Sequence, residues 1–85
     1  MIDKDRIKKK IFSRPRHNDC FRRLSKVERR YIIRNTGFSD LERKVFDLLC
    51  KGLSFNEISQ ELNYHLSYCK KITARVREKI LELIS

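Results

Sequence analysis

The clearest pattern of apolar and polar positions lies in the last third of the chain. There the apolar residues follow one another at intervals of three or four, which places their side chains on one face of a helix. They are Cys69, Ile72, Val76 and Ile80. The pattern predicts a helix over residues 66–83 with a polar, basic opposite face.

A shorter helix is predicted just before it. Ile58 and Leu62 lie four residues apart and therefore share a helix face. Asn63 is expected to end this helix, because Asn tolerates a left-handed backbone conformation. Only residues 63–65 then separate the two helices, so their connection must be a tight turn, and the small Ser59 suits the side that faces the crossing.

Two sequences of the type S-x-x-E indicate where helices begin. Residues 39–42 read SDLE and residues 54–57 read SFNE. In such a capping box the Ser hydroxyl accepts a hydrogen bond from the amide three residues on, and the Glu carboxylate accepts one from the Ser amide. The first box opens a helix that stops at Gly52, and its apolar face is Leu41, Val45, Leu48 and Leu49. The second opens the short helix, with Leu53 and Ile58 placed as a hydrophobic staple.

The N-terminal part is less regular. Residues 2–12 predict a short basic helix with Ile7 and Ile11 on one side, which Pro15 interrupts. Only two Gly and one Pro occur in 85 residues, which favours helices over a turn-rich β-fold. The predicted fold class is all-α: a small helical domain with a helix-turn-helix, preceded by one or two basic N-terminal helices.

A further helix is predicted over residues 20–34. Apolar residues recur there at gaps of three, three, four and one, namely Phe21, Leu24, Val27, Tyr31 and Ile32. We expect Asn18 or Asp19 to cap this helix, and Gly37 to end it in the left-handed conformation.

Charge divides the chain into two parts. Residues 1–37 carry 13 Lys and Arg against 4 Asp and Glu, a net +9, whereas residues 38–85 carry 8 against 7, a net +1. We therefore distinguish a basic N-terminal segment, 1–37, made of an arm and the helix over 20–34, from a helix-turn-helix domain, 38–85. The basic segment suits nucleic acid or an anionic membrane surface, and a solvated tail is the alternative.

Several classes of protein are not expected. Three cysteines without C-x-x-C spacing argue against a disulfide framework and a zinc cluster, and the pair His17 and Cys20 supplies too few ligands for a metal. No apolar run approaches the roughly 20 residues that cross a bilayer, so we expect no membrane partner and a cytoplasmic, nucleoid-associated protein. There is no Gly-rich phosphate loop, and Glu42 and Glu57 are explained as caps. We expect neither an enzyme nor a cofactor.

Residues 38–81 resemble the DNA-binding domain of LuxR-type (GerE-type) regulators, and in outline the related promoter-reading C-terminal domain of bacterial sigma factors. The matching positions are Glu42, Val45, Gly52, Ser54, Glu57, Ile58, Leu62, Lys70 and Lys79. The pattern departs where Asn63 replaces Gly, His65 replaces a capping Ser and Tyr68 replaces Thr. Ile72 and Thr73 depart as well. The resemblance implies the scaffold, and it implies no target sequence.

A short helix followed by a tight turn and an exposed basic helix is typical of a helix-turn-helix, in which the second helix lies in the major groove of DNA. The resemblance places Lys70 and Lys71 where the family contacts that groove. A Lys there can donate to guanine or to a phosphate. The full set of candidate contacts is Ser67, Tyr68, Lys70, Lys71, Ala74 and Arg75 on helix 66–83, Asn56 on the helix before it, and Arg14 and Arg16 in the N-terminal segment.

The sequence thus predicts a sequence-specific transcriptional regulator that binds double-stranded DNA, as a homodimer because one helix reads only a few base pairs. The basic segment would raise affinity by neutralising phosphates, either as an arm or as a helix beside the module. The alternative is a protein-interaction module that docks on RNA polymerase or a partner regulator. RNA binding is a third possibility, although an aromatic platform for stacking single-stranded bases is missing.

Overall fold

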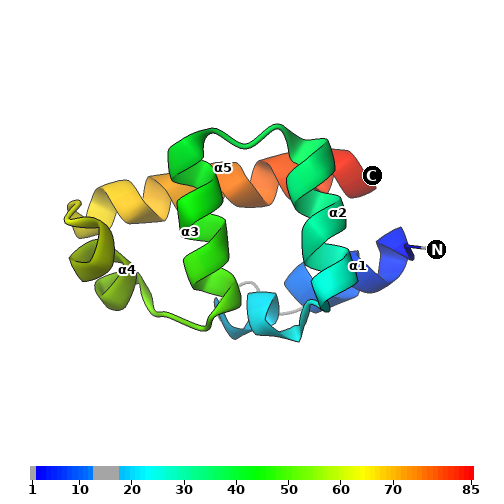
Figure 1. Ribbon diagram of the computed structural model, residues 1–85, viewed down its shortest axis with the longest axis horizontal. Coiled ribbons are helices and arrows are strands. Elements are labelled where there is room, and N and C mark those ends of the chain that lie inside the picture. The colour runs from blue at the N-terminus through cyan, green and yellow to red at the C-terminus, as the bar shows by residue number, and fades with distance from the viewer. Residues whose placement is uncertain (1, 13–17) are drawn as a thin grey trace.

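The computed structural model describes residues 2–12 and 18–85, and for residues 18–20 it describes only the backbone. The elements in chain order are α1 (Lys4–Phe12), a short 3-10 helix η1 (Asn18–Arg23), α2 (Lys26–Thr36), α3 (Asp40–Cys50), α4 (Phe55–Leu62) and α5 (Leu66–Ile84). Figure 1 shows α2 and α3 in front of the long α5, with α4 toward one end of α5 and α1 toward the other. Every element in the described residues is a helix, so the predicted all-α class is confirmed.

One hydrophobic core joins the N-terminal helices to the rest. Ile7 and Ile11 share one side of α1, as the sequence predicted, and both are fully buried. Phe21 of η1 meets Phe46 of α3 edge-on, with their ring centroids 5.9 Å apart. The same core contains the predicted apolar face of α5, namely Cys69, Ile72, Val76 and Ile80. Burying a large apolar side chain contributes about 1.5–3 kcal/mol, so each of the two isoleucines helps to hold α1 against its neighbours.

The prediction of a single helix over residues 20–34 is wrong. The chain first forms η1, breaks at residues 24–25, and begins α2 only at Lys26. The cause is a third S-x-x-E sequence, SKVE at residues 25–28, which the regular apolar spacing obscured. Ser25 has an extended backbone (φ −73°, ψ 166°), so a helix cannot run through it. No α-helix begins at Asn18 or Asp19.

The apolar face expected for that helix is only partly correct. Phe21, Leu24 and Ile32 are buried, and Tyr31 packs half-buried against the core. Val27, in contrast, is 64% exposed. Because the helix restarts after Ser25, the inward position in its first turn is occupied by Glu28 rather than by Val27.

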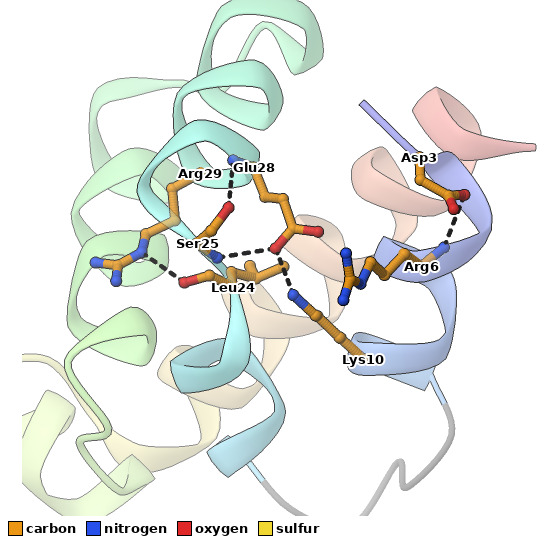
Figure 2. Close-up of polar contacts among 7 residues, drawn as sticks. All are labelled: Asp3, Arg6, Lys10, Leu24, Ser25, Glu28 and Arg29. Carbon is orange, nitrogen blue, oxygen red and sulfur yellow. Dashed lines mark hydrogen bonds and ion pairs between the residues drawn. The ribbon is translucent and has the colours of Figure 1, made fainter. Parts of the chain in front are cut away.

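Figure 2 shows the capping box that starts α2. The Ser25 amide donates to Glu28 Oε1 at 2.8 Å, and the Glu28 amide donates to Ser25 Oγ at 3.1 Å. Lys10 Nζ of α1 donates to the same carboxylate oxygen at 2.7 Å. Burial opposes the ionisation of Glu28, but hydrogen bonds from Lys10 and from the Ser25 amide outweigh it and lower the pKa of this carboxyl. Glu28 therefore caps α2 and links it to α1.

Both capping boxes predicted from the sequence are present, with Ser39 and Glu42 at the start of α3 and Ser54 and Glu57 at the start of α4. Glu42 is buried and accepts a hydrogen bond of 2.6 Å from Lys79 Nζ of α5. That bond and the one from the Ser39 amide lower the pKa of Glu42 despite its burial. The box of α3 thus also links α3 to α5.

Two glycines occupy left-handed conformations at helix ends. Gly37 ends α2 with φ 63°, as predicted. Gly52 follows α3 with φ 88°, and a Cβ atom there would overlap the side chain of Arg22. The connection from α3 to α4 therefore favours glycine for its backbone conformation, whereas the exposed Arg22 side chain could move aside for a Cβ atom.

Candidate nucleic-acid interface

The helix-turn-helix consists of α4, the turn at residues 63–65, and α5. Asn63 ends α4 in the left-handed conformation (φ 57°), as predicted. Ser59 closes the turn twice: its carbonyl accepts from the Tyr64 amide at 3.1 Å, and its hydroxyl donates to the Tyr64 carbonyl. Ser59 was expected to matter for its small size. Its hydroxyl also provides a hydrogen-bond partner for the Tyr64 carbonyl, and this helps to fix where α5 begins.

His65 is the N-cap of α5. Its Nδ1 accepts a hydrogen bond from the Ser67 amide at 3.3 Å and lies 3.0 Å from Ser67 Oγ. The LuxR-type pattern has a capping Ser at this position, and here an imidazole nitrogen takes that role. The departure at His65 therefore preserves the start of α5 by a different chemical group.

The two faces of α5 differ sharply. Its buried face lies toward the core and packs with α3 and α4. The opposite face is open to solvent, and all six candidate contacts on α5 are exposed: Ser67, Tyr68, Lys70, Lys71, Ala74 and Arg75. Farther along the helix Glu78, Leu81 and Glu82 are exposed as well. Asn56 of α4 is exposed too. Arg14 and Arg16 lie outside the described residues, so the structure places seven of the nine candidate contacts.

Lys70 and Lys71 have different surroundings. Lys70 Nζ lies 5.9 Å from the centroid of the Phe55 ring in α4, a cation–π contact between the two helices. Lys71 is exposed and makes no ion pair with any residue in the described part of the chain. Phe55 therefore holds Lys70 beside α4, while the Lys71 ammonium remains available. Sequence reasoning missed Phe55, because the contact depends on how α4 and α5 lie relative to each other.

An exposed aromatic pair borders the same surface. The Tyr64 and Tyr68 rings lie 5.3 Å apart between centroids, and the two residues are 45% and 41% exposed. Tyr68 was a candidate contact, whereas Tyr64 was missed. The spacing of four residues was a usable signal, but the turn at Asn63–His65 made it unclear that the two rings would meet. The pair gives the edge of the turn an exposed aromatic surface with two hydroxyl groups, the two rings being tilted by 49° to each other.

The basic N-terminal segment lies partly on the folded body. Of the two arrangements left open, an arm or a helix beside the module, residues 4–12 adopt the second: α1 contacts η1 and α5 through its buried isoleucines. Lys10 is engaged with Glu28, and the other cations of α1 remain exposed, namely Lys4, Arg6, Lys8 and Lys9. Most of the positive charge of α1 is therefore carried on an ordered surface.

Other chemistry finds little support in the described part of the chain. No group of three or more His, Cys, Asp or Glu there could hold a metal ion. His17 is outside the described residues, as is the side chain of Cys20. Cys50 and Cys69 are buried free thiols, and burial raises the pKa of Cys50 to about 12. No helix of the described residues has the length and apolar character to span a membrane.

Comparison with known proteins points to sigma factors. The chain is 50% identical over 48 aligned residues to the RNA polymerase sigma-H factor of Bacillus licheniformis. The alignment covers 53% of this chain and 22% of that relative, so the chain spans only a small share of its length. No family model and no solved structure matches. The chain thus contains a segment similar to part of a sigma factor, and the LuxR-type assignment stays a prediction.

Proposed function

We propose that this chain is a DNA-binding module of the bacterial transcription machinery that reads duplex DNA in the major groove with α5. The observation that carries the proposal is the exposed basic face of α5, which follows a turn closed by Ser59 and His65. In helix-turn-helix proteins the second helix enters the major groove and its N-terminal residues contact base edges. The similarity to an RNA polymerase sigma-H factor supports this reading.

The individual side chains suggest a division of roles. Lys71 is exposed and unpaired among the described residues, so it is the first candidate to donate to guanine O6 and N7. Arg75 follows it one turn later. Lys70 lies beside α4 on Phe55 and is better placed for a phosphate. Polar groups at the start of the two helices, Asn56, Ser67 and Tyr68, suit phosphate oxygens, and Ala74 is small enough for close approach.

Affinity requires more charge than residues 38–85 provide. Their net charge is only +1, and neutralisation of phosphates supplies a large share of protein–DNA affinity. The exposed cations of the N-terminal segment could add this contribution without choosing a sequence. Binding should therefore weaken steeply as the salt concentration rises.

The proposal is tested by selecting bound duplexes from a random DNA pool with the purified protein at physiological salt. We expect enrichment of a compact motif, and loss of preference at one or two base pairs in Lys71→Ala, which would remove about 1–3 kcal/mol of base discrimination. Lys44→Ala is the control, since Lys44 is exposed on α3 and outside the candidate interface. A two-fold motif would establish the predicted homodimer.

Two results would overturn the proposal. Strong binding without enrichment would mean that the basic surface alone holds DNA. Failure to retain any duplex would favour the second candidate function, docking on RNA polymerase, for which the specific observation is the sigma-factor relative. Co-purification with core RNA polymerase in the absence of DNA measures that alternative directly. In either function the protein acts by binding, without a catalytic step or cofactor, in the cytoplasm.

A further inference from the structure

A concave basic surface lies between α2 and α3. It is a groove of about 530 Å³ lined by Lys26, Arg29, Arg30, Ile33, Arg34 and Arg43. We call it the α2–α3 groove. Five of these six residues are cationic, and none of the described residues that line it is acidic. Both helices pack on α5, and Figure 1 shows them standing next to each other in front of it.

The fold does not account for these charges. Arg29 is positioned by a hydrogen bond of 3.2 Å from its Nε to the Leu24 carbonyl, visible in Figure 2. The other four cations make no hydrogen bond or ion pair through their side chains with any residue in the ranges 2–12 and 18–85. By contrast, Lys10 and Lys79 each bind a buried glutamate. Like charges gathered in a concavity repel one another and focus a positive potential, which an anionic ligand would relieve.

The groove is separate from the face of α5 proposed to read DNA. On α2, the buried residues are Glu28 and Ile32, the four groove cations of that helix lie on other sides of it, and Ile33 is partly buried against the core. α5 turns its buried face toward α2 and α3, so Lys71 and Arg75 point away from both. A duplex seated along the exposed face of α5 would leave the groove open.

We propose that the α2–α3 groove binds an acidic segment of a partner protein. Four of the five cations are arginines, whose planar guanidinium groups match carboxylates in a bidentate geometry. Ile33 is partly buried against the core, and the part that lines the groove offers an apolar contact to a side chain, which a chain of phosphates does not have. This site goes beyond the proposed function and does not depend on it.

The test uses the full chain and a short fluorescein-labelled peptide of Glu and Leu, with the same peptide carrying Gln for Glu as the uncharged control. Fluorescence anisotropy at low salt gives the dissociation constants. The variants are Arg30→Glu and Arg43→Glu, which alter opposite walls of the groove at exposed positions. Lys44→Glu is the matched control: it makes the same charge change next to Arg43 on α3, outside the groove. Circular dichroism confirms that each variant folds.

We expect each groove variant to weaken peptide binding by about tenfold or more, and Lys44→Glu to change it far less. Lys71→Ala should leave peptide binding intact, and protein already bound to duplex DNA should still take up the peptide. Failure of the DNA proposal would not alter these peptide results.

Three outcomes overturn the inference. The first is no binding of the Glu–Leu peptide at all. The second is an equal loss in Lys44→Glu, which would indicate attraction by overall charge. The third is mutual exclusion of peptide and duplex together with a loss of duplex affinity in Arg30→Glu as large as in Lys71→Ala. That result would assign the groove to the DNA backbone.

Discussion

The capping boxes of α2 and α3 differ from that of α4 in what their glutamates reach. Glu28 and Glu42 are buried, and each accepts a hydrogen bond from a lysine distant in the sequence. Glu57 is exposed, and within the described residues it makes hydrogen bonds only in its own box. The same S-x-x-E sequence therefore starts a helix in each case, but only where the glutamate is buried does it also join two helices.

The difference separates the helices joined by a lysine–glutamate pair, α5 among them, from α4 and its turn, which are held by local contacts. Beyond its box, α4 is anchored mainly by Ile58, its one buried residue, with Leu62 partly buried beside the core. The turn that follows is closed by the short-range bonds of Ser59 and His65. We therefore expect α4 and its turn to open at lower free energy than the helices around Phe46. Three predictions test this comparison, in order of decreasing expected effect.

Removal of a buried capping glutamate should lower the free energy of unfolding more than the other changes do. Glu42→Ala is expected to lower the free energy of unfolding by about 2 kcal/mol, because the helix loses a cap contact and Lys79 loses its partner. Glu57→Ala removes the equivalent carboxylate without a distant partner and should cost much less. Urea unfolding followed by circular dichroism measures both. Equal losses would show that the bond to Lys79 adds nothing, and a double-mutant cycle with Lys79→Met isolates its contribution.

The dependence of stability on pH should also show the contribution of the buried capping glutamate Glu42. Hydrogen bonds from Lys79 and the Ser39 amide lower the pKa of Glu42, so the folded state binds its proton less tightly than the unfolded state does. The resulting stability is fully present above the ordinary glutamate pKa of about 4.3 and is lost as the pH falls through the lower folded pKa. In Glu42→Gln, melting temperature should therefore fall less steeply below about pH 4.3 than in the unmodified protein. Parallel curves for the two proteins would contradict this.

The smallest effect is expected in the turn. Ser59→Ala removes the hydroxyl that donates to the Tyr64 carbonyl, at a cost of about 1 kcal/mol or less because water reaches this carbonyl. The loss should be local, with faster amide hydrogen exchange at Tyr64 and little change at Phe46 in the core. Gln60→Ala, one position along on the exposed side of α4, is the control. Equal acceleration of exchange across all helices would mean that the turn and the body unfold together.

Much of the secondary structure was predictable because its signals are local. The boxes at Ser39 and Ser54, the ends at Gly37 and Asn63, and the buried face of α5 all depend on residues within a turn or two of one another. The break at Ser25 carried the same local signal, and it was missed because the apolar residues around it fitted one continuous helix. The continuous helix placed Val27 on the buried face, so the exposure of Val27 and the burial of Glu28 were both missed for this one reason.

The exposure of the candidate contacts on α4 and α5 was predictable, whereas the contacts they make with one another were not. Periodicity alone placed Lys70 and Lys71 on the exposed face of α5. The contact of Lys70 with Phe55 and the meeting of Tyr64 with Tyr68 required the relative placement of α4, the turn and α5. The α2–α3 groove likewise could not be predicted from the sequence, because its walls belong to two helices on either side of a turn.

By itself the sequence determined where the described helices after residue 25 begin and end and which face of α5 is buried, because capping and periodicity act between near neighbours. Only the tertiary structure decided which charges are used within the fold. Lys10 meets a glutamate 18 residues away, and Lys79 meets one 37 residues away. Lys26 carries the same charge, yet it lines an open groove. Chain-distant packing, which no local pattern encodes, made two lysines structural and left the groove free for a partner.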